Sequence, residues 1–522
     1  MIIIRDILSL AILLIVCLLA SPALSATYYI SPTGSDANPG TLAKPWLTFS
    51  YAIDPARATC GDTLLLTNGT YGDGTSTGKI SISKLICAAG NELTIRALNQ
   101  RQAKIYDDGT GYTVRVQNSS HIIIDGLYAR SNDNASGTYG KPIYVNDSHH
   151  ITIRNNVVRN PNRYVNAHTY TAFRSQDILF EDNEAYVFHR HCVSAGQSER
   201  VVVRRQYCNP RGGRIPGGIA GIVGDADAVF SMYPCKDCIL ENSIADGTTH
   251  GIYLNEMNAT YDNNVLTSGN KILGSICYKC SAGNGIYPNG RKVADLNHSP
   301  HNFIIRDVAL IDFNSTGAAI KCQDCVNAVI DHVTVLGGGS GVTGILAIDS
   351  SFGATPAQNS ITLTNILVAG LTGNGFNVSG YDTWSGDRLS STGNRTAFRS
   401  SHPPTWLNTF TKAHGMGTCK VWVPDGAAVK GAGTGGSDIG ANILYRYVNG
   451  VLTATPLWDP KTGEFPHGAA DLDGTNRVEG QSLFDIHRRL NVNTGGCSFP
   501  RNYGNGYSDT ILPVAPVGLR AS

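Results

Sequence analysis

The sequence predicts an all-β solenoid in which short strands stack on one another, a parallel β-helix. Short β-branched strands such as "HITIRNNVV" and "NFIIRDVAL" recur after residue 120. Strands of a second kind, such as "HGIYLNE" and "NGIYPNG", alternate with them at intervals of roughly 20 to 36 residues. Turns that carry Asn or Asp separate the two kinds. Strands this short can bury their apolar sides only by packing on the next copy.

The irregular spacing distinguishes this fold from two other all-β architectures. A propeller would show a constant period of four strands per blade, and a sandwich would show hairpin turns. The Asn residues of turns such as "RNN" and "EDN" are expected to adopt left-handed conformations and to stack in ladders. Most of them are therefore structural.

The first segment, residues 1–26, has the pattern of a secretory signal. Arg5 precedes an apolar run, and Ser21, Pro22 and small residues up to Ala26 follow it. The same run could instead be a retained membrane anchor. No later segment approaches the ~20 apolar residues that a spanning helix needs. We therefore expect a secreted protein, extracellular or periplasmic, with no stable membrane span after cleavage.

The cysteines fit an oxidising compartment. Of 13 cysteines, Cys17 lies in the predicted signal, which leaves an even number for pairing. Three pairs have CxxC spacing, in "CKDC", "CYKC" and "CQDC". Zinc sites or redox motifs would use the same spacing, but in an exported chain we expect disulfides. Cys60 with Cys87 and Cys419 with Cys497 are the expected local pairs.

Composition and the change of pattern along the chain define the remaining organisation. A net charge of +1 with 16% charged residues argues against a nucleic-acid partner. Because the end rungs of a solenoid must be capped, we expect a cap with the first rungs at 27–116, the β-helix at 117–380 and an irregular extension packed on it at 381–522. A separate small domain is the alternative for the last segment.

The segment "YYISPTGSDANPGTLAKPWLTFSYAI" followed by "GDTLLLTNGTY" resembles the N-terminal cap of secreted right-handed parallel β-helix proteins. That group includes pectate lyases, chondroitinase-B-like and alginate lyases, and mannuronan C5-epimerases. The resemblance implies a right-handed β-helix and an acidic polysaccharide partner, but a fold alone selects no reaction. The Asp-Pro-His sequence of the epimerases is absent. The aspartates that surround calcium in family-nine pectate lyases have their nearest counterparts here in Asp225, Asp227 and Asp246.

Function on a stacked fold is expected in columns that run across rungs, about 4.8 Å apart. Aligning the second-kind strands puts a first set of residues inside, namely Ile252, Leu254, Ile286, Ile320 and Cys322. Alternation turns a second set outward, namely Tyr253, Asn255, Tyr287, Asn289, Lys321 and Gln323, with Ser194 and Arg174 on earlier rungs. Aromatic faces and amides suit a sugar-binding groove, although such residues also fit an ordinary scaffold.

A lyase that cleaves a uronic acid polymer needs a base and a positive neutraliser. Lys321 and the pair Arg291 and Lys292 are suitable in type, and lysine is the better base because its pKa moves on burial. Arg291 or Arg174 would then bind the carboxylate.

Four polar residues are expected at one strand edge. The alignment places His191, Asp227, His250 and Asn284 at corresponding positions, where they could form an acid/base cluster or a metal site. A slip of one residue would change their faces, and an inward position would make the histidines structural. Asp225 and Asp227 are the candidate calcium ligands.

The leading hypothesis is a polysaccharide lyase that acts by β-elimination on an acidic glycan. The alternatives are a non-catalytic polysaccharide-binding protein and a glycoside hydrolase. A hydrolase needs two facing carboxylates, for which Glu256 and Asp324 are the nearest residues, whereas the cationic set that a lyase needs is better represented.

Overall fold

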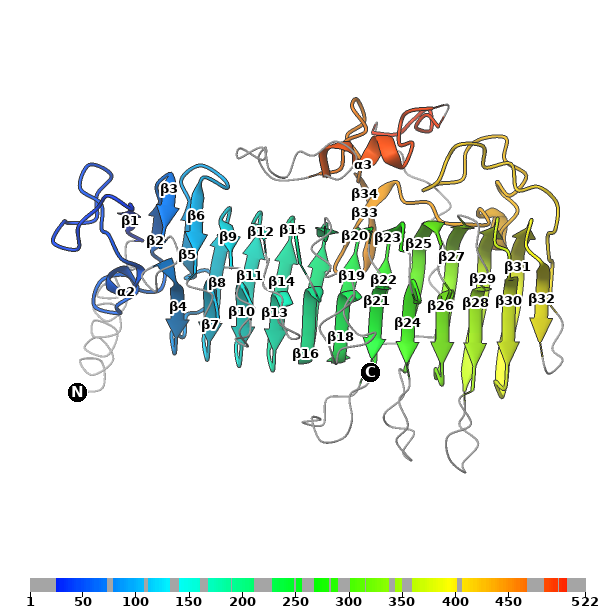
Figure 1. Cartoon of the computed structure of the whole chain (residues 1–522), viewed down its shortest axis with the longest axis horizontal. Helices are drawn as coiled ribbons and strands as arrows, with labels where there is room; N and C mark the ends of the chain where they lie inside the picture. Colours follow the sequence, from blue (N-terminus) through cyan, green and yellow to red (C-terminus); the bar gives the residue numbers. More distant parts are fainter. Residues whose placement is uncertain are drawn as a thin grey trace, which may run out of the picture.

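The protein is a right-handed parallel β-helix (Figure 1). The structure, a computed structural model, describes residues 25–72, 78–107, 111–131, 140–159, 168–188, 190–210, 228–247, 250–255, 267–280, 283–289, 301–314, 316–337, 343–349, 359–400, 406–466, 483–495 and 497–504. Within these ranges 32 strands join in one hydrogen-bonded array whose pairings are all parallel. The rungs follow one another along the long axis, as the sequence predicted.

Each complete rung has three strands, which we call face 1, face 2 and face 3 in chain order. Long strands run through two faces: β16 (His191–Arg204) and β18 (Ala228–Lys236) begin on face 1, and β25 (Ile304–Phe313), β27 (Ala328–Gly337), β29 (Ser360–Ala369) and β31 (Thr383–Thr392) join face 2 to face 3.

The other strands belong to single faces. Those of face 1 are β4 (Ile80–Ser83), β7 (Val114–Gln117), β10 (Ile143–Asn146), β13 (His168–Phe173), β21 (His250–Asn255), β24 (Ile286–Asn289), β26 (Ala318–Gln323), β28 (Thr343–Ile348), β30 (Asn374–Ser379) and β32 (Thr396–Ser400). Those of face 2 are β1 (Thr27–Ile30), β2 (Thr63–Leu66), β5 (Leu93–Ala97), β8 (Ser120–Asp125), β11 (His149–Arg154), β14 (Gln176–Glu181), β19 (Ile239–Glu241) and β22 (Lys271–Leu273). Those of face 3 are β3 (Gly69–Tyr71), β6 (Ala103–Tyr106), β9 (Tyr128–Arg130), β12 (Val157–Arg159), β15 (Glu184–Tyr186), β17 (Tyr207–Asn209), β20 (Ile244–Asp246) and β23 (Ile276–Tyr278).

The interior consists of apolar columns, because every strand alternates and every rung is in register. Ile252 pairs with Ile286, and Ile286 with Ile320, and all three are buried. This confirms the inward positions predicted for them and for Cys322, which is also buried. The side chain of Leu254 lies outside the described part of the structure.

Polar ladders satisfy the buried backbone at the bends. The Asn156 N–H donates to Asn183 Oδ1 on the next rung at 3.0 Å, which confirms the predicted stacking of Asn. The sequence analysis missed a second ladder between faces 1 and 2. There the N–H groups of Ser119, Ser148 and Ser175 each donate to the serine hydroxyl one rung further along. Each serine hydroxyl accepts the hydrogen bond of a buried amide that water cannot reach.

Aromatic residues close both ends of the solenoid. At the N-terminal end, Trp46 stacks on Tyr28 with ring centroids 4.5 Å apart, and Phe49 of the short helix α2 (Phe49–Ala52) is buried beside them. At the other end, Trp406 packs against Phe398 and the buried Trp384. Both caps shield the apolar interior from water.

Residues of the last segment cover face 3 (Figure 1). Buried Trp422 and Trp458 pack with Tyr186 and Tyr207 of that face. The segment contains the 3₁₀ turn η4 (Thr434–Gly436), the hairpin of β33 (Tyr445–Val448) and β34 (Val451–Pro456), and the helix α3 (Leu483–Arg489).

Six disulfides occur among the described residues. They join Cys60 to Cys87, Cys192 to Cys208, Cys235 to Cys238, Cys277 to Cys280, Cys322 to Cys325 and Cys419 to Cys497. Both predicted local pairs and all three CxxC pairs are thereby confirmed as disulfides, which fits an extracellular protein. No helix within the described ranges has the length and apolar character needed to cross a bilayer.

An ion pair fastens the extension to face 3, and its removal is expected to destabilise the contact. Arg489 Nη1 lies 2.7 Å from Asp246 Oδ2, and the two side chains are 13% and 3% exposed. Arg489→Ala leaves the Asp246 carboxylate buried without its cation. We expect a loss of about 3–5 kcal/mol in the free energy of unfolding, measured in urea by tryptophan fluorescence.

The neighbouring Arg488 is exposed and provides the matched control. Arg488→Ala should change the stability by less than about 0.5 kcal/mol. Equal losses in the two variants would show that the ion pair does not fasten the extension.

Candidate functional site

Face 1 carries two outward columns, and strand pairing gives their members directly. Tyr253 pairs with Tyr287, which precedes Lys321 in register. The first column is Ser81, Arg115, Tyr144, Thr171, Ser194, Ser231, Tyr253, Tyr287, Lys321, Leu346, Asn377 and Arg399. The second column includes Phe173, Gly196, Tyr233, Asn255, Asn289 and Gln323. Both follow the predicted register.

The predicted residues Tyr287 and Lys321 contact each other on this face. Lys321 Nζ lies 3.3 Å from the Tyr287 hydroxyl and 4.7 Å from the centre of its ring. The Tyr287 hydroxyl donates to Gln323 Oε1 at 2.8 Å. Burial lowers the pKa of Lys321. An amine, a phenol and an amide thus lie together, with Asn289 in register beside Gln323.

The prediction that Arg174 joins the outward column is wrong. The column position belongs to Phe173, and Arg174 follows it in the left-handed conformation with φ 48°. The chain bends there, so alternation no longer applies. Arg174 makes two hydrogen bonds to Asp147, at 2.8 and 2.9 Å, and these raise its pKa.

A third column precedes the inward strand residues, and we call it the entry column. His168 pairs with His191, and Ala228 pairs with His250. Asn284 lies two residues before Ile286, the partner of Ile252, and therefore follows His250. The predicted alignment of His191, His250 and Asn284 is confirmed, but Asp227 was placed one residue off because Ala228 takes its position.

Two members of the entry column were missed. Lys141 lies two residues before Ile143, whose partner is Tyr170, so Lys141 precedes His168 in register. The chain therefore places Lys141, His168 and His191 on three successive rungs. The signal was present in "GKPIYV", "AHTYTA" and "RHCVSA", each with a basic residue just before its strand. These basic residues were overlooked because they precede the part of each strand in which apolar and polar residues alternate.

The cation cluster consists of Lys141, His168, Arg190 and His191. The rings of His168 and His191 meet edge to face with centroids 4.7 Å apart, and His191 is buried. Lys141 and Arg190 are half-exposed. His168 is half-exposed as well, so His191 is the buried member of the cluster. The buried position of His191 agrees with the alternative prediction, in which His191 points inward and has a structural role.

Burial and neighbouring charges lower the pKa values of Lys141 and His168. Burial lowers the pKa of Lys141, and the Arg190 charge lowers it further. Burial also lowers the pKa of His168 well below its usual value, and His191, Arg190 and Lys141 add to this effect. Low polarity and neighbouring cations both disfavour the protonated forms. His168 is therefore neutral at pH 7, and Lys141 loses its proton more readily than a surface lysine.

Aromatic rings border the cation cluster. Tyr112 and Tyr144 stack with centroids 4.7 Å apart, and Lys141 Nζ lies 4.8 Å from the Tyr144 ring. The Arg115 guanidinium lies 5.2 Å from Tyr112. On the other side, the Tyr233 ring lies 6.1 Å from His191. Flat apolar surfaces thus alternate with cations along face 1.

Several predicted residues lie outside the described part of the structure. These are Asp225 and Asp227, the candidate calcium ligands, with Arg291, Lys292 and Glu256. For His250, Tyr253 and Asn255 only the strand position is described. Asp246, the third aspartate that the resemblance suggested, is buried beneath the extension and paired with Arg489.

No protein-family model and no curated protein matches the chain. Similar solved structures include the catalytic unit of the GH87 α-1,3-glucanase from Streptomyces thermodiastaticus strain HF3-3, with 12% identity and a TM-score of 0.48 over 75% of this chain and 71% of that one. The PL6 family alginate lyase AlyGC has 10% identity and a TM-score of 0.43, over 84% of this chain and 60% of that one. Pectate lyase Pel9A has 15% identity and a TM-score of 0.34, over 58% and 79%. These likenesses concern the fold alone.

The depressed pKa of His168 predicts a loss of stability in acid. In the unfolded chain the imidazole takes a proton below a pH of about 6.5, whereas the folded protein resists this proton. As the pH falls below about 6.5, His168 should reduce the free energy of unfolding by up to about 1.4 kcal/mol per pH unit. In His168→Gln, urea unfolding at several pH values should show a shallower dependence.

His332 provides a control of opposite sign. Although burial acts against its charge, the hydrogen bond and charge of Asp331 raise its pKa, and Nδ1 lies 2.9 Å from Asp331 Oδ1. The stabilisation that His332 contributes is present at low pH. It is lost as the pH rises through the pKa that His332 has in the folded protein. His332→Gln should therefore lose the stabilisation that the wild type gains as the pH falls toward about 6.5, and should leave the slope below that pH unchanged. Identical pH profiles for the two variants would contradict the assignment for His168.

Proposed function

We propose that the protein is a carbohydrate-active β-helix protein that binds an acidic polysaccharide along face 1 and cleaves it by β-elimination at the cation cluster. The observation that carries the proposal is the gathering of Lys141 and Arg190 with His168 and the buried His191, beside the stacked pair Tyr112 and Tyr144. Cations bind uronate carboxylates, and aromatic rings cover the apolar faces of sugars.

The proposed chemistry gives Lys141 and Arg190 different roles. Lys141, as the neutral amine, takes the proton from the carbon next to the uronate carboxyl group. Arg190 binds that carboxylate and stabilises the charge that develops on it. The electron pair of the broken C–H bond forms a carbon–carbon double bond, the β C–O bond breaks, and the leaving sugar oxygen takes up a proton. The products are an unsaturated uronate end and a new hydroxyl end.

The residue types of the entry column favour a lyase over a hydrolase. A hydrolase requires two carboxyl groups across the scissile bond. The entry column from Lys141 to Asn284 consists of Lys141, His168, His191, Ala228, His250 and Asn284, none of which is a carboxylate. The column thus supplies bases and cations. A non-catalytic binding protein would use the same surface, and the activity assay below separates the two.

Lys321, Tyr287 and Gln323 form a second part of the proposed binding surface. Lys321 lies six rungs after Tyr144 in the same column, which corresponds to about 29 Å at the usual strand spacing. A polymer lying along face 1 would contact both regions. In this proposal Tyr253, Asn255 and Asn289 belong to the same surface. Arg291, Lys292 and His250 remain alternative catalytic residues with Lys321 as the alternative base.

The test incubates the protein with pectate, alginate and glycosaminoglycans and follows the absorbance of the unsaturated product. We expect activity on at least one of them. Lys141→Ala should reduce kcat by about 10²- to 10⁴-fold, because it removes the proposed base. Lys44→Ala, at an exposed position in the N-terminal cap, is the matched control and should leave the rate unchanged.

Lys321→Ala tests the second part of the surface. Loss of one charged hydrogen-bonding group should raise KM about tenfold and leave kcat nearly unchanged. If Lys321→Ala abolishes activity and Lys141→Ala retains it, the base is Lys321. Binding of an acidic glycan without any absorbance change would overturn the lyase and leave a binding protein.

Calcium is the remaining cofactor proposal, with Asp225 and Asp227 as its ligands. Calcium takes carboxylate and carbonyl oxygens and could neutralise the substrate carboxylate in place of Arg190. Activity that disappears with a chelator and returns with Ca²⁺, but not with Zn²⁺, would support it. Unchanged activity in the chelator would assign the neutralising role to the protein's own cations.

A further inference from the structure

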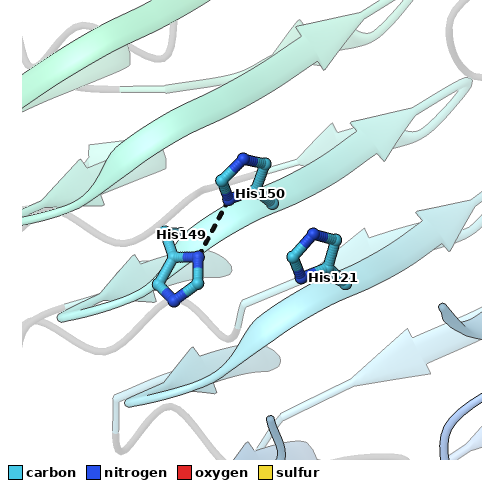
Figure 2. Close-up of side chains that lie close together, drawn as sticks. All are labelled: His121, His149 and His150. Atoms are coloured by element: carbon cyan, nitrogen blue, oxygen red, sulfur yellow. Dashed lines mark hydrogen bonds between the residues drawn. The ribbon is translucent and has the colours of Figure 1, made fainter. Parts of the chain in front are cut away.

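Three histidines gather at the bend between face 1 and face 2, away from the cation cluster (Figure 2). His121 belongs to β8, and His149 and His150 belong to β11 on the next rung. His121 and His150 both adopt the left-handed conformation, with φ values of 56° and 55°. The same bend on two stacked rungs therefore presents the two imidazoles side by side.

The geometry is that of a set of metal ligands. One ring nitrogen from each histidine lies within 4.8 Å of the other two. The Nδ1 atoms of His149 and His150 are 2.9 Å apart. The His121 and His150 rings are nearly parallel, with centroids 4.6 Å apart and planes at 6°. The Nδ1 of His121 is buried and makes no hydrogen bond to any residue within the described ranges.

A carboxylate on the following rung lies near the His150 ring. Asp177 Oδ2 lies 4.0 Å from His150 Nε2, on the side of the ring away from the Nδ1 that faces His149. Two hydrogen bonds from Arg200, at 2.7 and 2.9 Å, hold Asp177 in place. Metal-binding histidines characteristically use a carboxylate for their second nitrogen, which orients the ring.

We propose that His121, His149 and His150 form a binding site for a divalent transition metal, with Zn²⁺ as the ion tested, that links the rungs of β8 and β11. Three imidazoles suit Zn²⁺, Ni²⁺ or Cu²⁺ and not Ca²⁺, which prefers oxygen ligands. His149 and His150 are exposed and His121 is half-exposed, so water completes the coordination.

The test uses the full chain without a histidine tag, freed of metal by chelation and dialysis. Titration with ZnCl₂ by calorimetry should show an equivalent of Zn²⁺ that the double variant His121→Gln/His150→Gln lacks. Zn²⁺ should also raise the Tm of the wild type and not that of the variant. Co²⁺ should give a visible ligand-field spectrum only when the histidines are intact. CaCl₂ should produce none of these changes.

Two further variants separate metal binding from folding. Asp177→Asn keeps the side-chain shape and should weaken Zn²⁺ binding about tenfold or more. His414→Gln, outside the cluster, should leave binding unchanged, and each variant must show the wild-type circular dichroism. Retention of the equivalent in the folded double variant, or no Zn²⁺ binding by the wild type at about 100-fold excess, would overturn the proposal.

Discussion

The register of the parallel hydrogen-bonded rungs is the constraint on which the rest of the structure depends. Each residue lies about 4.8 Å from its counterpart on the next rung, so it has nearly the same kind of neighbour along the whole solenoid. A column of Ile252, Ile286 and Ile320 therefore makes a continuous core. Side chains that pack well against their counterparts on the next rung recur along a column. Side chains that repel their counterparts need a compensating partner.

The C-terminal extension determines which outer surface remains available. Tyr186 and Tyr207 of face 3 are buried in one apolar cluster with Trp422 and Trp458 of the extension. The burial is also polar, because Tyr447 donates to Asp307 at 2.5 Å and Arg489 pairs with Asp246. A buried carboxylate without such partners would be costly. Face 3 is thus covered by the extension.

Features of the fold and the site that repeat from rung to rung can be predicted from the sequence. Predictions from the sequence are wrong or missing at positions where the repeat ends. Alternation within strands correctly placed Tyr287, Lys321 and their amide neighbours, because each strand copies the last. It failed for Arg174, which follows the strand at a left-handed bend, and for Asp227, where a one-residue slip separates it from the column. Lys141 and His168 were missed for the same reason. Which face the extension would cover was also beyond the sequence, since it depends on contacts between distant segments.

Charged side chains form two kinds of arrangement along the solenoid. In the first kind, arginines stack against acids of the neighbouring rung. The pairs are Arg154 with Asp125, Arg174 with Asp147, Arg200 with Asp177, Arg205 with Asp182 and Arg306 with Asp331.

The entry column brings basic residues together. Lys141, His168 and His191 succeed one another, and Arg190 lies near them. Burial lowers the pKa values of Lys141 and His168, and neighbouring charges lower them further, so both groups release a proton more readily than they would at the surface. The proposed chemistry uses this property, because a base must be neutral before it takes a proton from the substrate. In that proposal Arg190 binds the substrate carboxylate while Lys141 acts as the base.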